Sequence, residues 1–98
     1  MSEIVTLISS DNKKYEIPEH IANESKTLRV FFDSNRPFIE AIERKVVLPM
    51  NSKLLIRAIE YMKYKYQYRG KKAHEAPEFH ITDEEALDLL DASVYLKI

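Results

Sequence analysis

The chain opens with apolar positions at strand-like spacing. Residues 4–8 form a β-branched apolar run, and residues 15–17 alternate apolar with polar. Between them lie Asp11 and Asn12, two residue types that tolerate the positive φ angle of a tight turn. This pattern predicts a β-hairpin. Because both faces of the first strand are apolar, we expect its own helices to cover one face, with another chain as a candidate for the other.

Two short helices are predicted next. Pro18 ends the second strand and suits the first turn of a helix, because its fixed φ angle is already helical. Ser25 is a candidate N-cap for a helix in which Leu28, Phe31 and Phe32 fall at i, i+3 and i+4. We expect these three side chains to form one buried stripe.

Residues 34–45 follow no clear period. Pro37 breaks any helix there, and Phe38, Ile39 and Ile42 are apolar among many charges. The pattern indicates a loop that carries apolar side chains.

The longest helical pattern lies in the middle of the chain, after a short strand predicted over residues 45–48. It runs from about Ser52 to Tyr66, and its apolar residues share one face at helical spacing. Gly70 and the lysines beside it are ordinary signals for a helix end.

A last helix is predicted at the C-terminal end. Thr82 and Glu85 form a capping box, in which Thr82 caps the amide of Glu85 and Glu85 reaches back. Apolar residues cover more than half of the circumference that follows, so one face can pack on the sheet while the other needs a partner. Together the elements predict an α+β fold, with a small three-stranded sheet flanked by helices, in a single domain spanning residues 1–98.

Composition excludes several classes of chemistry. The 98 residues contain no cysteine and a single glycine, so thiol chemistry, cysteine-bound metals and a glycine-rich phosphate loop are all ruled out. The net charge of −1 gives no overall field for nucleic acid or anionic lipid. No apolar run is long enough to span a bilayer, and we expect a protein of the nucleus and cytoplasm.

Candidate catalytic and metal-binding residues are sparse. His74 and His80 lie six residues apart with Pro77 between them, so a helix cannot align them as zinc ligands, and His20 is distant in sequence. The carboxylates of residues 83–88 are typical of a helix start and a solvated face. We therefore expect no enzyme, no metal, no cofactor and no small-molecule substrate.

Residues 63–72 carry a possible nucleic-acid signal. Cations alternate there with tyrosines, a pattern that would place stacking rings in a row if the segment were a strand. On a helix the rings point in different directions around the axis, and the preceding pattern favours a helix. A nucleic-acid-binding module therefore stays as the alternative, and a helix end with amphipathic tyrosines is preferred.

An interaction surface has the best support. The last two helices carry more aromatic and aliphatic side chains than they can bury against a three-stranded sheet, and a groove between them would accept an amphipathic helix. The alternative, that these side chains only complete the core, stays open. They are Tyr61, Tyr64, Phe79, Leu87, Leu90 and Tyr95.

Five stretches of the chain resemble the elongin C family in order and spacing. They are residues 7–11 (Leu-Ile-Ser-Ser-Asp), His20 followed by Ser25 and Thr27, residues 61–65 (Tyr-Met-Lys-Tyr-Lys), residues 77–79 (Pro-Glu-Phe), and residues 86–96. The resemblance implies the BTB/POZ fold and a non-catalytic adaptor. Such an adaptor pairs with elongin B, binds BC-box helices of elongin A or of substrate receptors, and engages a cullin. It would act in a ubiquitin ligase or in transcription elongation. A self-associating BTB scaffold is a more distant alternative.

The resemblance also implies which residues bind. The BC-box pocket carries over onto Tyr61, Phe79, Leu87, Leu89, Leu90, Ser93, Tyr95 and Ile98. A cullin-facing side carries over onto Phe38, Ile39, Ile42 and Asp91. Ser93 replaces a usual alanine, and Asp91 falls where the family tends to be apolar.

Overall fold

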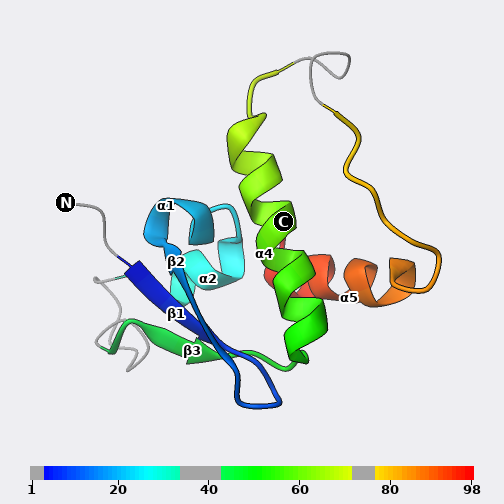
Figure 1. Cartoon of the computed structure of the whole chain (residues 1–98). Helices are drawn as coiled ribbons and strands as arrows, with labels where there is room; N and C mark the ends of the chain where they lie inside the picture. The colour runs from blue at the N-terminus through cyan, green and yellow to red at the C-terminus, as the bar shows by residue number, and fades with distance from the viewer. Residues whose placement is uncertain (1–3, 34–42, 72–76) are drawn as a thin grey trace.

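The computed structural model of the protein describes residues 4–33, 43–71 and 77–98 (Figure 1). Three strands in this part of the chain form one sheet in the order β2-β1-β3, so the predicted α+β class with a three-stranded sheet is confirmed. The elements are β1 (Ile4–Ile8), β2 (Lys14–Pro18), α1 (Glu19–Ala22), α2 (Lys26–Phe31), β3 (Lys45–Val47), α4 (Ser52–Gln67) and α5 (Ala86–Leu96).

The predicted hairpin joins β1 to β2. The two strands pair antiparallel, and Asn12 occupies the turn with a φ angle of 67°. Ser9 closes the turn, because its amide donates to the Lys13 carbonyl at 2.9 Å and its hydroxyl oxygen accepts from the Lys13 amide at 2.9 Å. β3 then pairs parallel to β1 on the other side, which makes β1 the central strand.

The two faces of the sheet differ. Val5, Leu7 and Val46 point inward and are buried in the core with side chains of all the longer helices. On the opposite side, which we call the outer face, Ile4 and Val47 remain 47% and 65% exposed. The helices of the described residues therefore cover one face of the first strand and leave apolar side chains exposed on the other.

The amino end of α4 is attached to the hairpin turn. Asn51 caps the helix, its side chain accepting from the Leu54 amide at 2.8 Å. The Asp11 carboxylate accepts from both the amide and the hydroxyl of Ser52, each at 2.8 Å. Hydrogen bonds from the Ser9 and Ser52 side chains lower the pKa of Asp11 to about 2. The helix ends at Gln67, one residue beyond the predicted end, and Gly70 follows with a φ angle of 79°.

Helix α2 has the predicted N-cap, and the same residue reaches α5. The Ser25 hydroxyl oxygen accepts from the Leu28 amide at 3.1 Å and donates to the Leu96 carbonyl at 2.5 Å. Thr27 donates in the same way to the Tyr95 carbonyl at 2.6 Å. Two carbonyls that lack helical partners at the end of α5 are thereby satisfied. The predicted stripe is buried at Leu28 and Phe32.

The start of α5 differs from the prediction. The helix begins at Ala86, and only half of the capping box forms: the Glu85 carboxylate accepts from the Thr82 amide at 3.1 Å. The Glu85 amide donates to the carbonyl of Thr82 and not to its hydroxyl. The physical reason is that residues 82–85 close a turn in which the Thr82 carbonyl takes the Glu85 amide, so the helix starts only after this turn. The Glu85 carboxylate also binds Arg57 of α4.

Candidate functional site: an apolar groove between α4 and α5

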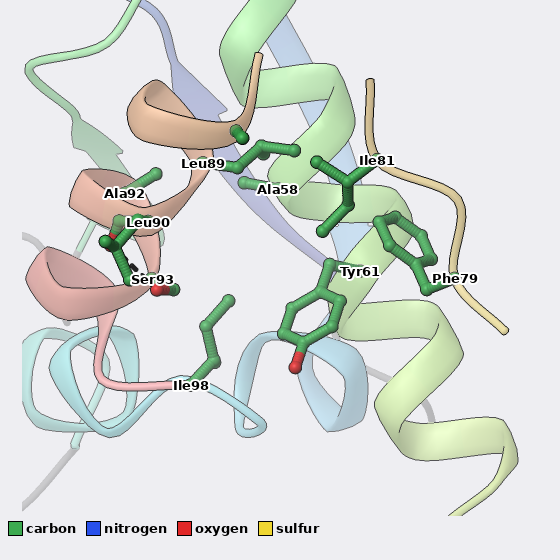
Figure 2. A pocket seen from close by; sticks show the side chains of 10 residues that line it. Ala58, Tyr61, Phe79, Ile81, Leu89, Leu90, Ala92, Ser93 and Ile98 are labelled. Atoms are coloured by element: carbon green, nitrogen blue, oxygen red, sulfur yellow. Dashed lines mark hydrogen bonds between the residues drawn. The ribbon is translucent and has the colours of Figure 1, made fainter. Parts of the chain in front are cut away.

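A groove of about 370 Å³ opens where α4 and α5 cross, closed on one side by the segment that leads into α5 (Figure 2). Its lining is almost wholly apolar and comes from α4, from the leading segment, and from α5 with the residue that follows it. The lining residues are Ala58, Tyr61, Phe79, Ile81, Ala86, Leu89, Leu90, Ala92, Ser93 and Ile98.

Small side chains keep the floor of the groove open. Ala58 of α4 and Ala92 of α5 are both buried where the helices approach each other. Leu89, also buried, completes this floor and packs α5 toward α4. Larger side chains at the two alanines would fill the space between the helices, so the groove exists because these positions are short.

The side of the groove near α4 is aromatic. The ring of Phe79 lies 5.2 Å from that of Tyr61 and 5.4 Å from that of Tyr64, at the tilted angles that aromatic pairs prefer. Tyr61 and Tyr64 stack on each other, and Tyr64 also contacts Tyr68. Figure 2 shows Tyr61 and Phe79 side by side at this edge.

These contacts bear on the nucleic-acid alternative. The tyrosines of residues 63–72 lie on α4 or just after it, as predicted, and do not form a row on a strand. Tyr64 and Tyr68 pack on aromatic neighbours, and Tyr66 lies 4.8 Å from the His20 ring of α1. Because the rings contact each other and α1, the structure favours the amphipathic helix end over a stacking platform.

The far end of the groove is formed by Ile98, which a left-handed turn places there. Lys97 has φ 56° and ψ 53°, and the amides of Lys97 and Ile98 both donate to the Ser93 carbonyl. The Ser93 hydroxyl donates to the Leu90 carbonyl at 2.7 Å, so this wall presents no unpaired donor to the groove.

A charged pair lies beside the leading segment, outside the groove lining. Arg57 binds Glu85 through two nitrogens, with its Nη2 atom 2.9 Å from Oε1 and its Nε atom 3.2 Å from each oxygen. The hydrogen bonds from Arg57 and the Thr82 amide lower the pKa of Glu85 below its ordinary value. The hydrogen bond to the Glu85 carboxylate, with a further contribution from Glu60, raises the pKa of Arg57.

The family resemblance implied eight pocket residues. Six line the groove: Tyr61, Phe79, Leu89, Leu90, Ser93 and Ile98. Leu87 and Tyr95 do not; they lie on exposed faces of α5, with 76% and 40% of their surface accessible. Sequence reasoning missed Ala58, Ile81, Ala86 and Ala92. Two of these residues could have been predicted from their spacing. Ala58 lies one helical turn before Tyr61, and Ile81 lies two residues after Phe79.

Of the four predicted cullin-facing residues, only Asp91 lies in the part of the chain that the structure describes. Phe38, Ile39 and Ile42 lie outside the described residues. Asp91 is exposed on α5, on the same face as Leu87 and Val94 by helical spacing.

The composition of the groove suits the binding of apolar groups. Within residues 4–33, 43–71 and 77–98, no three histidine or acidic side chains are placed to hold a metal ion. The groove lining contains neither a histidine nor a carboxylate. No helix in the described ranges is both long and apolar enough to cross a membrane. An apolar groove of this size can accept apolar side chains of another molecule.

Comparisons with known proteins agree with this fold. Residues 3–67 match the family model described as the Skp1 family, tetramerisation domain. The chain is 39% identical to Elongin-C of Saccharomyces cerevisiae, over 98% of this chain and 97% of that protein. It is 33% identical to SKP1-like protein 1A of Arabidopsis thaliana over 96% of this chain, which spans only 55% of the plant protein.

A solved structure is similar over nearly the whole length. One chain of a crystal structure of the yeast Rad7 and Elc1 complex superposes with a TM-score of 0.69 at 32% identity. The match covers 98% of this chain and all of that chain. The BTB/POZ fold expected from the sequence is therefore confirmed.

Proposed function

The chain belongs to the Skp1 and elongin C family, and from this premise we propose that it is a non-catalytic adaptor of a ubiquitin ligase. In this proposal the α4–α5 groove receives one amphipathic helix, the BC-box helix of a substrate receptor or of elongin A. The similar solved chain comes from a complex of Rad7 and Elc1, and this supports a role in binding other proteins.

The observation that carries the proposal is the apolar groove beside an exposed apolar helix face. Leu90 lines the groove and is still 59% exposed, and Leu87 one turn earlier is 76% exposed. Apolar surface that is exposed and continuous with an apolar groove marks protein-interaction sites. A leucine that enters the groove from a partner helix gains about 1.5 to 3 kcal/mol from its buried apolar surface.

Two further surfaces belong to the proposal. The outer face of the sheet, with Ile4 and Val47 exposed, is offered as the elongin B side. The exposed face of α5 around Asp91 is offered as part of the cullin side, together with Phe38, Ile39 and Ile42. Residues 1–98 act as one domain in this proposal. The protein is located in the nucleus and cytoplasm and has a second role in transcription elongation.

The experiment measures the affinity of a fluorescent BC-box peptide, an amphipathic helix with a leucine anchor, for wild type and for two groove variants. Tyr61→Ala and Phe79→Ser remove parts of the aromatic side without deleting buried core volume, since both side chains are only partly buried. We expect each to weaken binding about tenfold or more, the equivalent of ~1.4 kcal/mol. The far-ultraviolet circular dichroism spectrum should not change.

Ile56→Ala is the matched control, because Ile56 lies on α4, is 41% exposed and does not line the groove. It should bind the peptide as wild type does. Wild-type affinity in both groove variants would show that the groove does not receive the helix. Unfolding of both would show that these rings belong to the core.

A further inference from the structure

The segment that closes the groove is held by one arginine of α4. The Arg57 Nη2 atom donates to the His80 carbonyl, and its Nε and Nη2 atoms bind the Glu85 carboxylate. Its guanidinium carbon also lies 4.8 Å from the centre of the Phe79 ring. A single side chain therefore contacts the segment at Phe79 and His80, in its first half, and at Glu85, its last residue.

The groove residue Ile81 lies between these contacts. Figure 2 shows Ile81 and Phe79 on the segment, facing Tyr61 and Ala58 of α4. Glu85 fixes the local turn as well, because its carboxylate accepts from the Thr82 amide. The positions of Phe79 and Ile81 thus depend on the bonds that Arg57 makes on either side of Ile81.

Burial contributes little to holding this segment. Between residues 77 and 85, only Phe79 and Glu85 are partly buried, and the other seven residues are exposed. Ile81 itself is 43% exposed. The segment therefore lacks the buried apolar anchors that fix α4 and α5, and its polar and aromatic contacts to α4 take on that role.

The geometry of the arginine fits this task. The pair with Glu85 uses two nitrogens, and the side chains are 23% and 18% exposed, so solvent screens them less than an open surface pair. Arginine has five donors in a rigid plane, so it can bind a carbonyl and a carboxylate at once. A lysine at the same position has a single nitrogen and could not span both partners in this geometry.

We propose that Arg57 is a positioning residue of the groove: by binding the His80 carbonyl and the Glu85 carboxylate, it sets Phe79 and Ile81 at the width that a partner helix needs. This inference rests on the proposed function. It adds that affinity for the helix depends on a residue outside the groove lining.

The test combines two measurements on Arg57→Gln, Arg57→Lys, Glu85→Gln and the double variant Arg57→Gln with Glu85→Gln. Amide hydrogen exchange in the free protein reports whether residues 79–85 are held. Anisotropy with the BC-box peptide reports affinity. We expect Arg57→Gln to speed exchange in residues 79–85 about tenfold, with no change in the buried part of α4, and to weaken peptide binding about fivefold to tenfold.

If Arg57 and Glu85 act through one contact, the effects of their variants on exchange and affinity should not add. Glu85→Gln should reproduce part of the loss, and the double variant should be no worse than Arg57→Gln, because both remove the same bond. Arg57→Lys should fall between wild type and Arg57→Gln. Glu60→Gln is the matched control: Glu60 accepts from Arg57 Nη1 at 2.6 Å but lies on α4 and does not contact the segment. It should change neither measurement.

The outcomes separate this inference from the proposed function. If wild type does not bind the peptide, the proposed function is wrong, and the exchange data alone decide whether Arg57 holds the segment. If Arg57→Gln weakens binding while exchange of residues 79–85 stays the same, Arg57 contacts the peptide directly and the positioning role is overturned. Unchanged exchange and unchanged affinity also overturn it, as do losses that add in the double variant.

Discussion

The two ends of α5 are attached to the protein by different chemistry. At the carboxyl end, the neutral hydroxyls of Ser25 and Thr27 bind the last carbonyls, and both Ser25 and Leu96 are fully buried. At the amino end, the attachment is the charged pair of Arg57 and Glu85, and the helix starts among exposed residues.

This difference separates stability from binding. A buried hydrogen bond that is lost leaves an unpaired polar group in the core, so the carboxyl end contributes directly to the free energy of unfolding. The amino end is partly exposed, so its pair contributes less to the fold, while it borders the groove and sets its shape. Changes at the carboxyl end should therefore alter stability, and changes at the amino end should alter binding.

The largest expected effect is at the carboxyl end. Ser25→Ala removes the N-cap of α2, leaves the Leu28 amide without its partner, and leaves the Leu96 carbonyl buried without its donor. We expect the free energy of unfolding to fall by about 2 to 3 kcal/mol, roughly half from each loss. Urea denaturation followed by circular dichroism measures it.

Ser10→Ala is the control, an exposed serine in the hairpin turn, and should stay within about 0.5 kcal/mol of wild type. Under conditions where Ser25→Ala is folded, its affinity for the BC-box peptide should match that of wild type. A large loss of affinity without a loss of stability would reverse the comparison.

A smaller effect in the opposite direction is expected at Lys97. This residue adopts a left-handed conformation, with a φ angle of 56°, at the end of α5. A side chain is disfavoured there, so Lys97→Gly should raise the free energy of unfolding by about 0.5 to 1 kcal/mol. The same denaturation assay checks it. A decrease would show that the Lys97 side chain makes a stabilising contact that outweighs its backbone strain.

Only the local features of the two attachments could be predicted from the sequence. Ser25 is readable as an N-cap because a serine precedes an apolar stripe, and the groove aromatics Tyr61 and Phe79 stand out by type and by family resemblance. The Ser25 bond to Leu96 joins residues 71 apart, and the Arg57 bond to Glu85 joins residues 28 apart. No local pattern contains such a pair, so both attachments of α5 were invisible to periodicity.

The same limit explains the errors at the start of α5. The sequence predicted a capping box at Thr82 and Glu85 that starts the helix, but only the Glu85 half forms, and the Glu85 carboxylate also binds Arg57 of α4. Likewise, a buried alanine at Ala58 or Ala92 has the same sequence signature whether it packs tightly or opens a groove. Only the crossing of the two helices distinguishes these cases.

The smallest expected effect separates the two ends by their response to acid. The folded pKa of Glu85 lies below its ordinary value of 4.5, so its contribution to the attachment is complete above that value and is lost as pH falls through the lowered folded pKa. The hydroxyl contacts at Ser25 and Thr27 do not titrate. On acidification, methyl signals of Ile81 in a carbon-proton NMR spectrum should therefore shift before those of Leu96.

Glu85→Gln should remove that early shift and leave the Leu96 signals unchanged, because only the amino end of α5 depends on the carboxylate. Simultaneous shifts at both residues in wild type would mean that the two ends of α5 unfold as one unit. The amino end would then not respond to acid independently of the carboxyl end.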